Sequence, residues 1–159
     1  MLLSKSVSEK IQAELDRINP IFGVMWKHGD FKFSDEYDTA ALEVMDGKFV
    51  VTFNPKYWKK LNKYNRIFII CHEYLHIILG HWLQSKNKNI DAEWENIAQD
   101  IQVNEMLTRT FGFRRNNIKN WKEQCWIDVI FKNHAHLIQV GQSSSYYYKL
   151  IVECLAPVV

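Results

Sequence analysis

The sequence predicts a single α+β domain spanning residues 1–159, and three patterns indicate this fold class. The chain is 47% apolar and 24% charged, a composition typical of one globular domain with a sizeable core. Apolar and polar residues alternate on both sides of the pair Asp46-Gly47, which predicts a β-hairpin. Elsewhere the apolar residues recur with helical spacing, so helices accompany a small sheet.

The N-terminal half predicts one helix, a loop and the hairpin. One helical face carries four apolar residues at the required spacing: Val7, Ile11, Leu15 and Ile18. Pro20 and Gly23 interrupt this pattern, and residues 27–38 are predicted as a loop. The two hairpin strands lie around Leu42–Val44 and Phe49–Phe53.

Three further helices follow the hairpin. Asn54-Pro55 predicts a helix start, because an Asn cap before a proline is a typical N-terminus, and this short helix reaches about Leu61. The next helix, about Arg66–Gln84, is apolar on nearly all sides and is therefore expected at the centre of the domain. After a polar loop at 85–91, a third helix spans about Ala92–Arg109.

Beyond residue 111 the pattern weakens. The segment 121–131 is compatible with several structures, and Ser143-Ser144 predicts a cap for a last helix over Tyr146–Leu155.

Composition argues against several functional classes. The formal charge of +2, with dispersed Lys and Arg, gives no support for a nucleic-acid partner. The apolar stretch 67–83 contains His72, Glu73, His76 and His81, so a membrane span is not expected. Three cysteines without paired spacing predict free thiols in a reducing compartment, and the N-terminus lacks a signal-peptide pattern, so the cytoplasm is the expected location.

The segment His72-Glu73-Tyr74-Leu75-His76 carries the strongest chemical signal. Residues four apart on a helix share a face, so the two imidazoles can converge on one zinc ion. Glu73 then stands beside the metal, where it can act as general base toward a zinc-activated water. The pattern therefore predicts one catalytic zinc ion held by His72 and His76.

A catalytic zinc site needs a third protein ligand, and two residues are candidates. Asp100 lies on an apolar stripe of the third helix, where an unpaired carboxylate would be costly, and Asn104 one turn on could support a ligand histidine. His81 is the alternative. If the helix continues, five residues rotate it about 140° away from His76, and only a sharp break at Gly80 would bring it back.

Several segments resemble a metallopeptidase domain family that commonly stands N-terminal to a von Willebrand factor A-like domain in bacterial and phage proteins. The similar segments are Phe53-Asn54-Pro55, HEYLHIILGH, WENIAQDIQVN and SSSYYYKLI. The resemblance implies a zincin-like fold, in which a small sheet packs on the central HExxH helix and a following helix supplies the acidic ligand. By position it assigns the metal to His72, His76 and Asp100 and catalysis to Glu73.

This resemblance supports a zinc-dependent metallopeptidase acting on a peptide or protein substrate. Because the chain ends at Val159, the companion domain would be absent or replaced by a separate regulatory protein. An extended substrate could add to an edge strand of the hairpin at Phe49–Phe53. The alternative function is a catalytically silent, zinc-stabilised module of the same fold that binds a partner protein.

Overall fold

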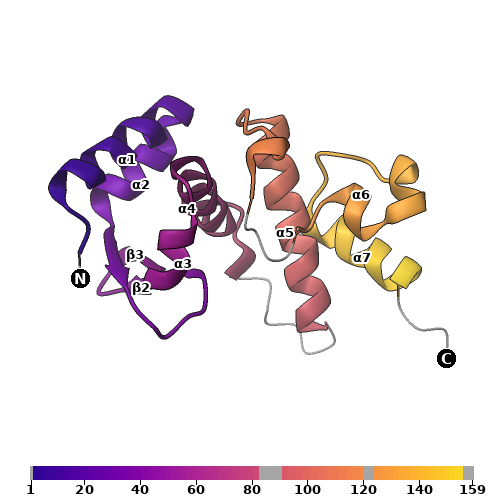
Figure 1. Cartoon of the computed structure of the whole chain (residues 1–159). Coiled ribbons are helices and arrows are strands. Elements are labelled where there is room, and N and C mark those ends of the chain that lie inside the picture. Colours follow the sequence, from indigo (N-terminus) through magenta and orange to yellow (C-terminus); the bar gives the residue numbers. More distant parts are fainter. Residues whose placement is uncertain (1, 83–90, 120–123, 156–159) are drawn as a thin grey trace. The chain divides into compact units, whose positions relative to one another are not determined.

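Helices make up most of the chain, and one small sheet accompanies them (Figure 1). The structure is a computed structural model, and it describes residues 2–82, 91–119 and 124–155. Both the helices and the three-stranded sheet agree with the predicted α+β class.

The contacts between Cα atoms divide the chain into two compact units. The first unit contains Met1–Tyr74 and Phe111–Asn120, and the second contains Leu75–Thr110 and Trp121–Val159. The boundary falls inside helix α4 (Lys63–Ile78), which is continuous through it.

Two helices begin the first unit. Helix α1 (Lys5–Ile18) starts at Ser4, whose hydroxyl accepts a hydrogen bond from the Val7 amide, and it buries Ile11 and Leu15 as its pattern predicts. Helix α2 (Pro20–His28) was not predicted, because Pro20 was interpreted as a breaker. Pro20 is instead the first residue of the helix. The Asn19 side chain caps this helix by accepting a hydrogen bond from the Ile21 amide.

The sheet has the order β1-β3-β2. Strands β2 (Ala40–Met45) and β3 (Lys48–Phe53) form the predicted antiparallel hairpin, and Asp46 and Gly47 turn it with φ of 51° and 76°. Strand β1 (Asp30–Phe33) pairs in parallel with β3, so the prediction of a loop over 27–38 is wrong for these residues.

This order also corrects the predicted binding edge. Strand β3 contains Phe49–Phe53 and has a hydrogen-bonded strand on each side, so its backbone groups are already used by β1 and β2. A substrate cannot add to it, and β1 and β2 are the edges of the sheet.

An aromatic cluster joins the sheet to helix α3 (Pro55–Lys60). The ring centroids of Phe53 and Trp58 lie 4.8 Å apart, and those of Phe31 and Trp58 lie 5.2 Å apart, both nearly edge to face. The Arg66 guanidinium lies 4.3 Å above the Trp58 ring and donates a 2.7 Å hydrogen bond to the Trp58 carbonyl. These contacts fix the start of α4 against the sheet.

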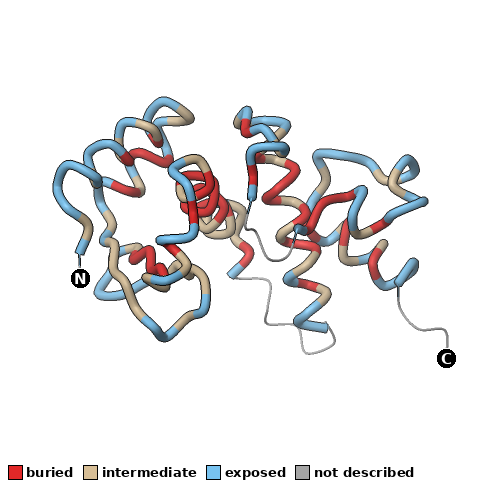
Figure 2. Tube along the Cα trace, viewed as in Figure 1, coloured by how far each residue is buried: buried red, intermediate tan, exposed pale blue. Residues whose placement is uncertain are grey.

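Helix α4 is buried along much of its length, as its apolar sequence predicts (Figure 2). It ends at Ile78 rather than near Gln84, because Gly80 adopts φ +71°, a left-handed conformation that stops a helix. Among the described residues, no helix combines the length and apolar character needed to cross a bilayer.

The second unit is built on helix α5 (Ala92–Arg109), whose bounds agree with the prediction. The Asp91 side chain caps it by accepting from the Glu93 and Trp94 amides. Of the predicted loop 85–91, the part 85–90 lies outside the described residues.

Helix α7 (Ser144–Leu155) packs on α5, and the Ser143 hydroxyl accepts from the Tyr146 amide near its start. The ambiguous segment contains the short helix α6 (Ile127–Ile130), and residues 121–123 lie outside the description. The first unit also contains the 3-10 turn η2 (Arg115–Asn117), and the second contains η3 (Lys132–Leu137). The core of the second unit consists of Ala98, Ile101, Cys125, Ile127, Phe131, Tyr147 and Ile151.

We expect Gly29→Ala to destabilise the chain. A Cβ atom there would stand 2.5 Å from the Phe49 carbonyl oxygen and 2.9 Å from that of Met25, and neither backbone atom can rotate away. Overpacking of this kind costs about 1–3 kcal/mol. Urea unfolding measures the loss. The control is Lys27→Ala, an exposed position in helix α2, which ends just before Gly29, with an expected change within about 0.5 kcal/mol. Equal stability of the two variants would contradict the close approach.

Candidate metal centre

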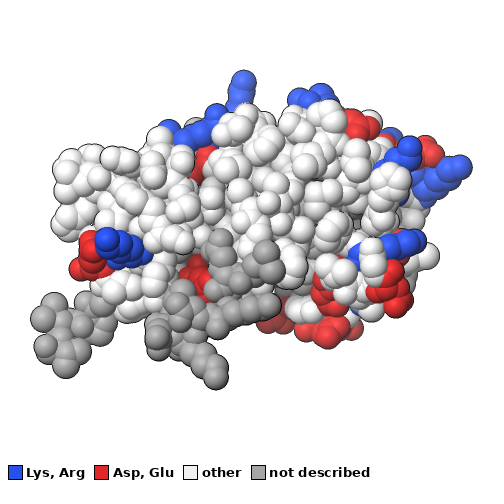
Figure 3. Space-filling model, turned by 180° about the vertical axis from the view of Figure 1, so that it is seen from behind, with Lys and Arg blue, Asp and Glu red and all other residues white. Residues whose placement is uncertain are grey.

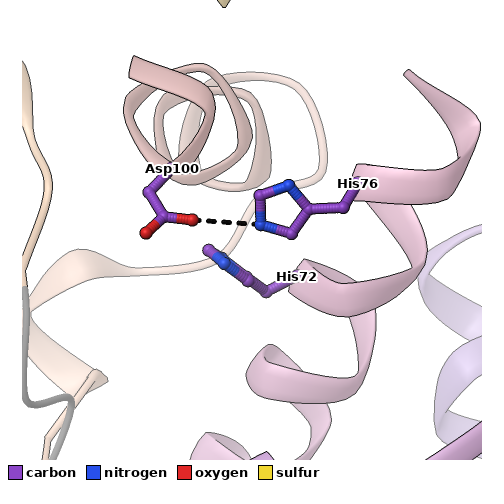
Figure 4. Close-up of side chains that lie close together, drawn as sticks. All are labelled: His72, His76 and Asp100. Carbon is purple, nitrogen blue, oxygen red and sulfur yellow. Dashed lines mark hydrogen bonds and ion pairs between the residues drawn. The ribbon is translucent and has the colours of Figure 1, made fainter. Parts of the chain in front are cut away.

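His72 and His76 lie one turn apart on helix α4, so the helix itself sets their spacing (Figure 4). His72 is 2% exposed, and its ring lies 6.2 Å from that of Phe68 on the preceding turn. The neutral imidazole is the form that binds metals, and one of its ring nitrogens then offers a lone pair.

Asp100 reaches the same place from helix α5. Its Oδ1 lies 3.0 Å from Nε2 of His76, and both side chains belong to the second unit (Figure 4). The side chains of His76 and Asp100 are 22% and 23% exposed. The two groups are therefore held together while a path to solvent remains.

The structure brings His72, His76 and Asp100 into one group. One possible ligand atom from each residue lies within 4.8 Å of the others. Atoms bound to one tetrahedral zinc ion at ~2.0–2.2 Å are about 3.3–3.6 Å apart, so small side-chain rotations suffice to accommodate an ion. Two imidazoles and one carboxylate are also a donor set that suits zinc and leaves a coordination position open. The residues present fit a metal ion.

Glu73 is not a member of this group, so it is not among the candidate metal ligands. It lies beside Tyr57 of helix α3, and both residues belong to the first unit. Burial and the negative charge of Glu73 raise the pKa of Tyr57 to about 12, since both disfavour the phenolate. Tyr57 therefore keeps its hydroxyl proton at neutral pH.

His81 lies on the other side of the His76 ring. The break at Gly80 turns the chain back, and Nδ1 of His81 comes to 2.8 Å from Nδ1 of His76. Nε2 of His81 lies 2.7 Å from Oε1 of Gln102. His81, the predicted alternative ligand, thus contacts the candidate ligand His76. His81 is not part of the group formed by His72, His76 and Asp100.

Sequence reasoning missed Gln102, whereas it named Asn104 as a possible support for a ligand histidine, which stays a prediction. Asn104 is fully buried and donates to the Cys125 carbonyl at 3.1 Å, which ties α5 to the segment before α6. Gln102 stands two residues from Asp100 on a helix, so spacing alone points its side chain to another face. Only the return of the chain after Gly80 gives it a histidine partner.

A cavity of about 300 Å³ opens beside Asp100 within the second unit. Three of its residues, Glu93, Asn96 and Ile97, precede Asp100 by seven, four and three positions and so share its face of α5. The remaining lining residues are Gln124, Cys125 and Ile130. A side chain of a molecule held at Asp100 can therefore extend into this cavity.

Charged side chains are dispersed on the face shown in Figure 3. The Lys and Arg side chains that it shows form small groups with uncharged side chains between them. This distribution agrees with the low net charge of +2.

An α+β chain with two histidines and an aspartate converging on one point has the features of a metal-binding protein. Comparison with known families makes the class more specific. The model of a family described as "Putative metallopeptidase domain" matches residues 6–126, and the chain belongs to this family. No curated protein and no solved structure gives a match.

We expect the purified chain to bind about one zinc ion and to lose stoichiometric binding in His72→Ala, His76→Ala and Asp100→Ala, because each removes one of three donors. Metal content after dialysis measures this. Asp128→Ala, which removes an exposed carboxylate of the same unit as Asp100, is the control and keeps the metal. Full metal content in Asp100→Ala together with loss in His81→Ala would reverse the choice of third ligand.

Proposed function

We propose that this member of the metallopeptidase family is a zinc-dependent peptidase, with His72, His76 and Asp100 as metal ligands and Glu73 as general base. The observation that carries the proposal is the convergence of the three donor side chains from α4 and α5. A zinc ion in such a site supplies a Lewis acid and lowers the pKa of water toward neutrality. A zincin-like arrangement of the whole chain is part of the same proposal.

The chain's own residues divide the remaining work. The Glu73 carboxylate takes the proton of the attacking water and later delivers it to the nitrogen of the leaving amine. Tyr57 is a neutral hydroxyl beside Glu73, so it can donate a hydrogen bond in the site without competing for that proton. Asp100 and the two histidines are held by rigid helices, which keeps the donors close to one another.

The cavity beside Asp100 is the proposed place for a substrate side chain. Ile97 and Ile130 supply apolar wall, while Glu93 and Asn96 line it with exposed polar groups. Its volume of about 300 Å³ is enough for one amino-acid side chain rather than for a folded partner. The expected substrate is a peptide or an unfolded segment of a protein, in agreement with the prediction from sequence.

We expect Glu73→Gln to lower peptidase activity by about 100- to 10,000-fold while zinc stays bound, because only the proton acceptor is removed. Cleavage of a peptide library from a digested proteome, read by mass spectrometry, measures activity. Glu153→Gln, the same change at an exposed position of α7, is the control and should keep full activity. If Glu73→Gln and the original chain cleave the same peptides equally fast, or if neither cleaves any, the catalytically silent zinc-stabilised binding module is the better reading.

We expect Asn96→Trp to change which peptides are cleaved, because the indole would occupy the cavity beside Asp100. The ratio kcat/KM should fall most for peptides with large side chains next to the cleaved bond, with zinc content unchanged. Asn96→Ala removes the same amide without filling the cavity and is the matched control. A uniform effect of Asn96→Trp on all peptides would place the substrate elsewhere.

A further inference from the structure

A chain of hydrogen bonds leads away from the metal centre through side chains that have no place among the proposed ligands. It runs from His76 to His81, from His81 to Gln102, and from Gln102 to the backbone amide of Ser144. All four residues belong to the second unit, and His81 is 3% exposed. The last donor of this series, the backbone amide of Ser144, fixes the direction of each hydrogen bond before it.

A backbone N–H can only donate a hydrogen bond, so the Ser144 amide is the donor in its contact with Gln102. The Ser144 amide lies 3.1 Å from the Gln102 side chain, so the atom that it meets is the carbonyl oxygen Oε1. The same Oε1 lies 2.7 Å from Nε2 of His81. An oxygen acceptor requires a donor there, so Nε2 of His81 carries its ring proton.

The position of the proton on His81 determines which nitrogen of His76 donates. A neutral His81 with its proton on Nε2 has a bare Nδ1, which is an acceptor. This Nδ1 lies 2.8 Å from Nδ1 of His76, so the His76 nitrogen donates. The proton of a neutral His76 ring then resides on Nδ1, and Nε2, the nitrogen that faces Asp100, keeps its lone pair for a metal.

Asp100 makes this arrangement necessary. Its carboxylate lies 3.0 Å from Nε2 of His76 and attracts the ring proton to the nitrogen that must be bare for metal binding. A second acceptor on the opposite nitrogen shifts the balance, because it lets the proton rest on Nδ1 with a hydrogen bond made.

We propose that His81 and Gln102 are positioning residues, which orient the His76 ring and select the tautomer that binds the metal. They act through His76 and do not touch the ion. The proposal rests on the proposed metal site, but it is independent of peptide hydrolysis, since metal affinity and ring protonation are measured without a substrate.

The first test is zinc affinity, measured by competition with a chromophoric chelator. His81→Leu and Gln102→Leu should weaken zinc binding by about 10- to 100-fold, the usual effect of losing a partner of a ligand histidine. His81→Asn should stay within a few-fold of the original, because the Asn Oδ1 stands near the position of the imidazole Nδ1 and can accept from His76. Gln139→Leu, which alters an exposed glutamine of the same unit, is the control and should have no effect.

The second test needs no variant, so a misfolded mutant cannot obscure it. Nitrogen-15 spectra of the histidine rings at about pH 8, where an ordinary imidazole is neutral, report which nitrogen carries the proton. We expect a proton on Nε2 of His81 in the metal-free chain, and a proton on Nδ1 of His76 in the zinc-loaded chain. In His81→Leu the His76 Nδ1 proton should exchange faster with water.

The outcomes separate this inference from the proposed function. A His81 ring protonated on Nδ1, or His81→Leu with unchanged zinc affinity, would overturn the positioning role whether or not the chain is a peptidase. The expected tautomers and affinities in a chain that cleaves no peptide would sustain the positioning role and refute the peptidase.

Discussion

Helix α4 has to be apolar enough to be buried and also has to present polar side chains at the candidate metal centre. Much of the structure depends on these two requirements. The helix is buried, so most of its surface has to be apolar, yet it holds His72, Glu73 and His76 within little more than one turn. Burying polar groups without partners is costly. The cost is offset where the histidines converge with Asp100, and Glu73 is only partly buried. The apolar residues of α4 therefore bury the helix, and its histidines lie where Asp100 can partner them.

Gly80 determines which side chain contacts Nδ1 of His76, the ring nitrogen that does not face Asp100. A continuing helix would carry the next histidine about 140° around its axis, away from His76. The left-handed conformation of Gly80, at φ +71°, ends the helix and folds His81 back against the His76 ring. This one backbone torsion therefore places His81, the alternative third ligand of the sequence prediction, beside the candidate ligand His76.

Helix α5 serves the core and the site with different faces. Ala98 and Ile101 are fully buried in the core of the second unit, which fixes the helix against α7. Asp100 and Asn96 lie on another face, at the metal group and the cavity beside it. A rigid core on one side keeps the donor and the cavity wall in place on the other, as precise chemistry requires.

Local signals in the sequence were enough for the hairpin at Asp46-Gly47, the bounds of α5 and the pairing of His72 with His76, because turn chemistry and helical spacing act between near neighbours. Helix α2 had such a signal too, since Asn19-Pro20 repeats the capping pattern of Asn54-Pro55. The rest depended on distant segments. Strand β1 is four residues long and exists through its pairing with β3, and Gln102 meets His81 only after the chain reverses. Sequence alone determined which side chains could bind a metal, whereas tertiary structure decided which of them meet, because contacts between distant residues depend on the path of the whole chain.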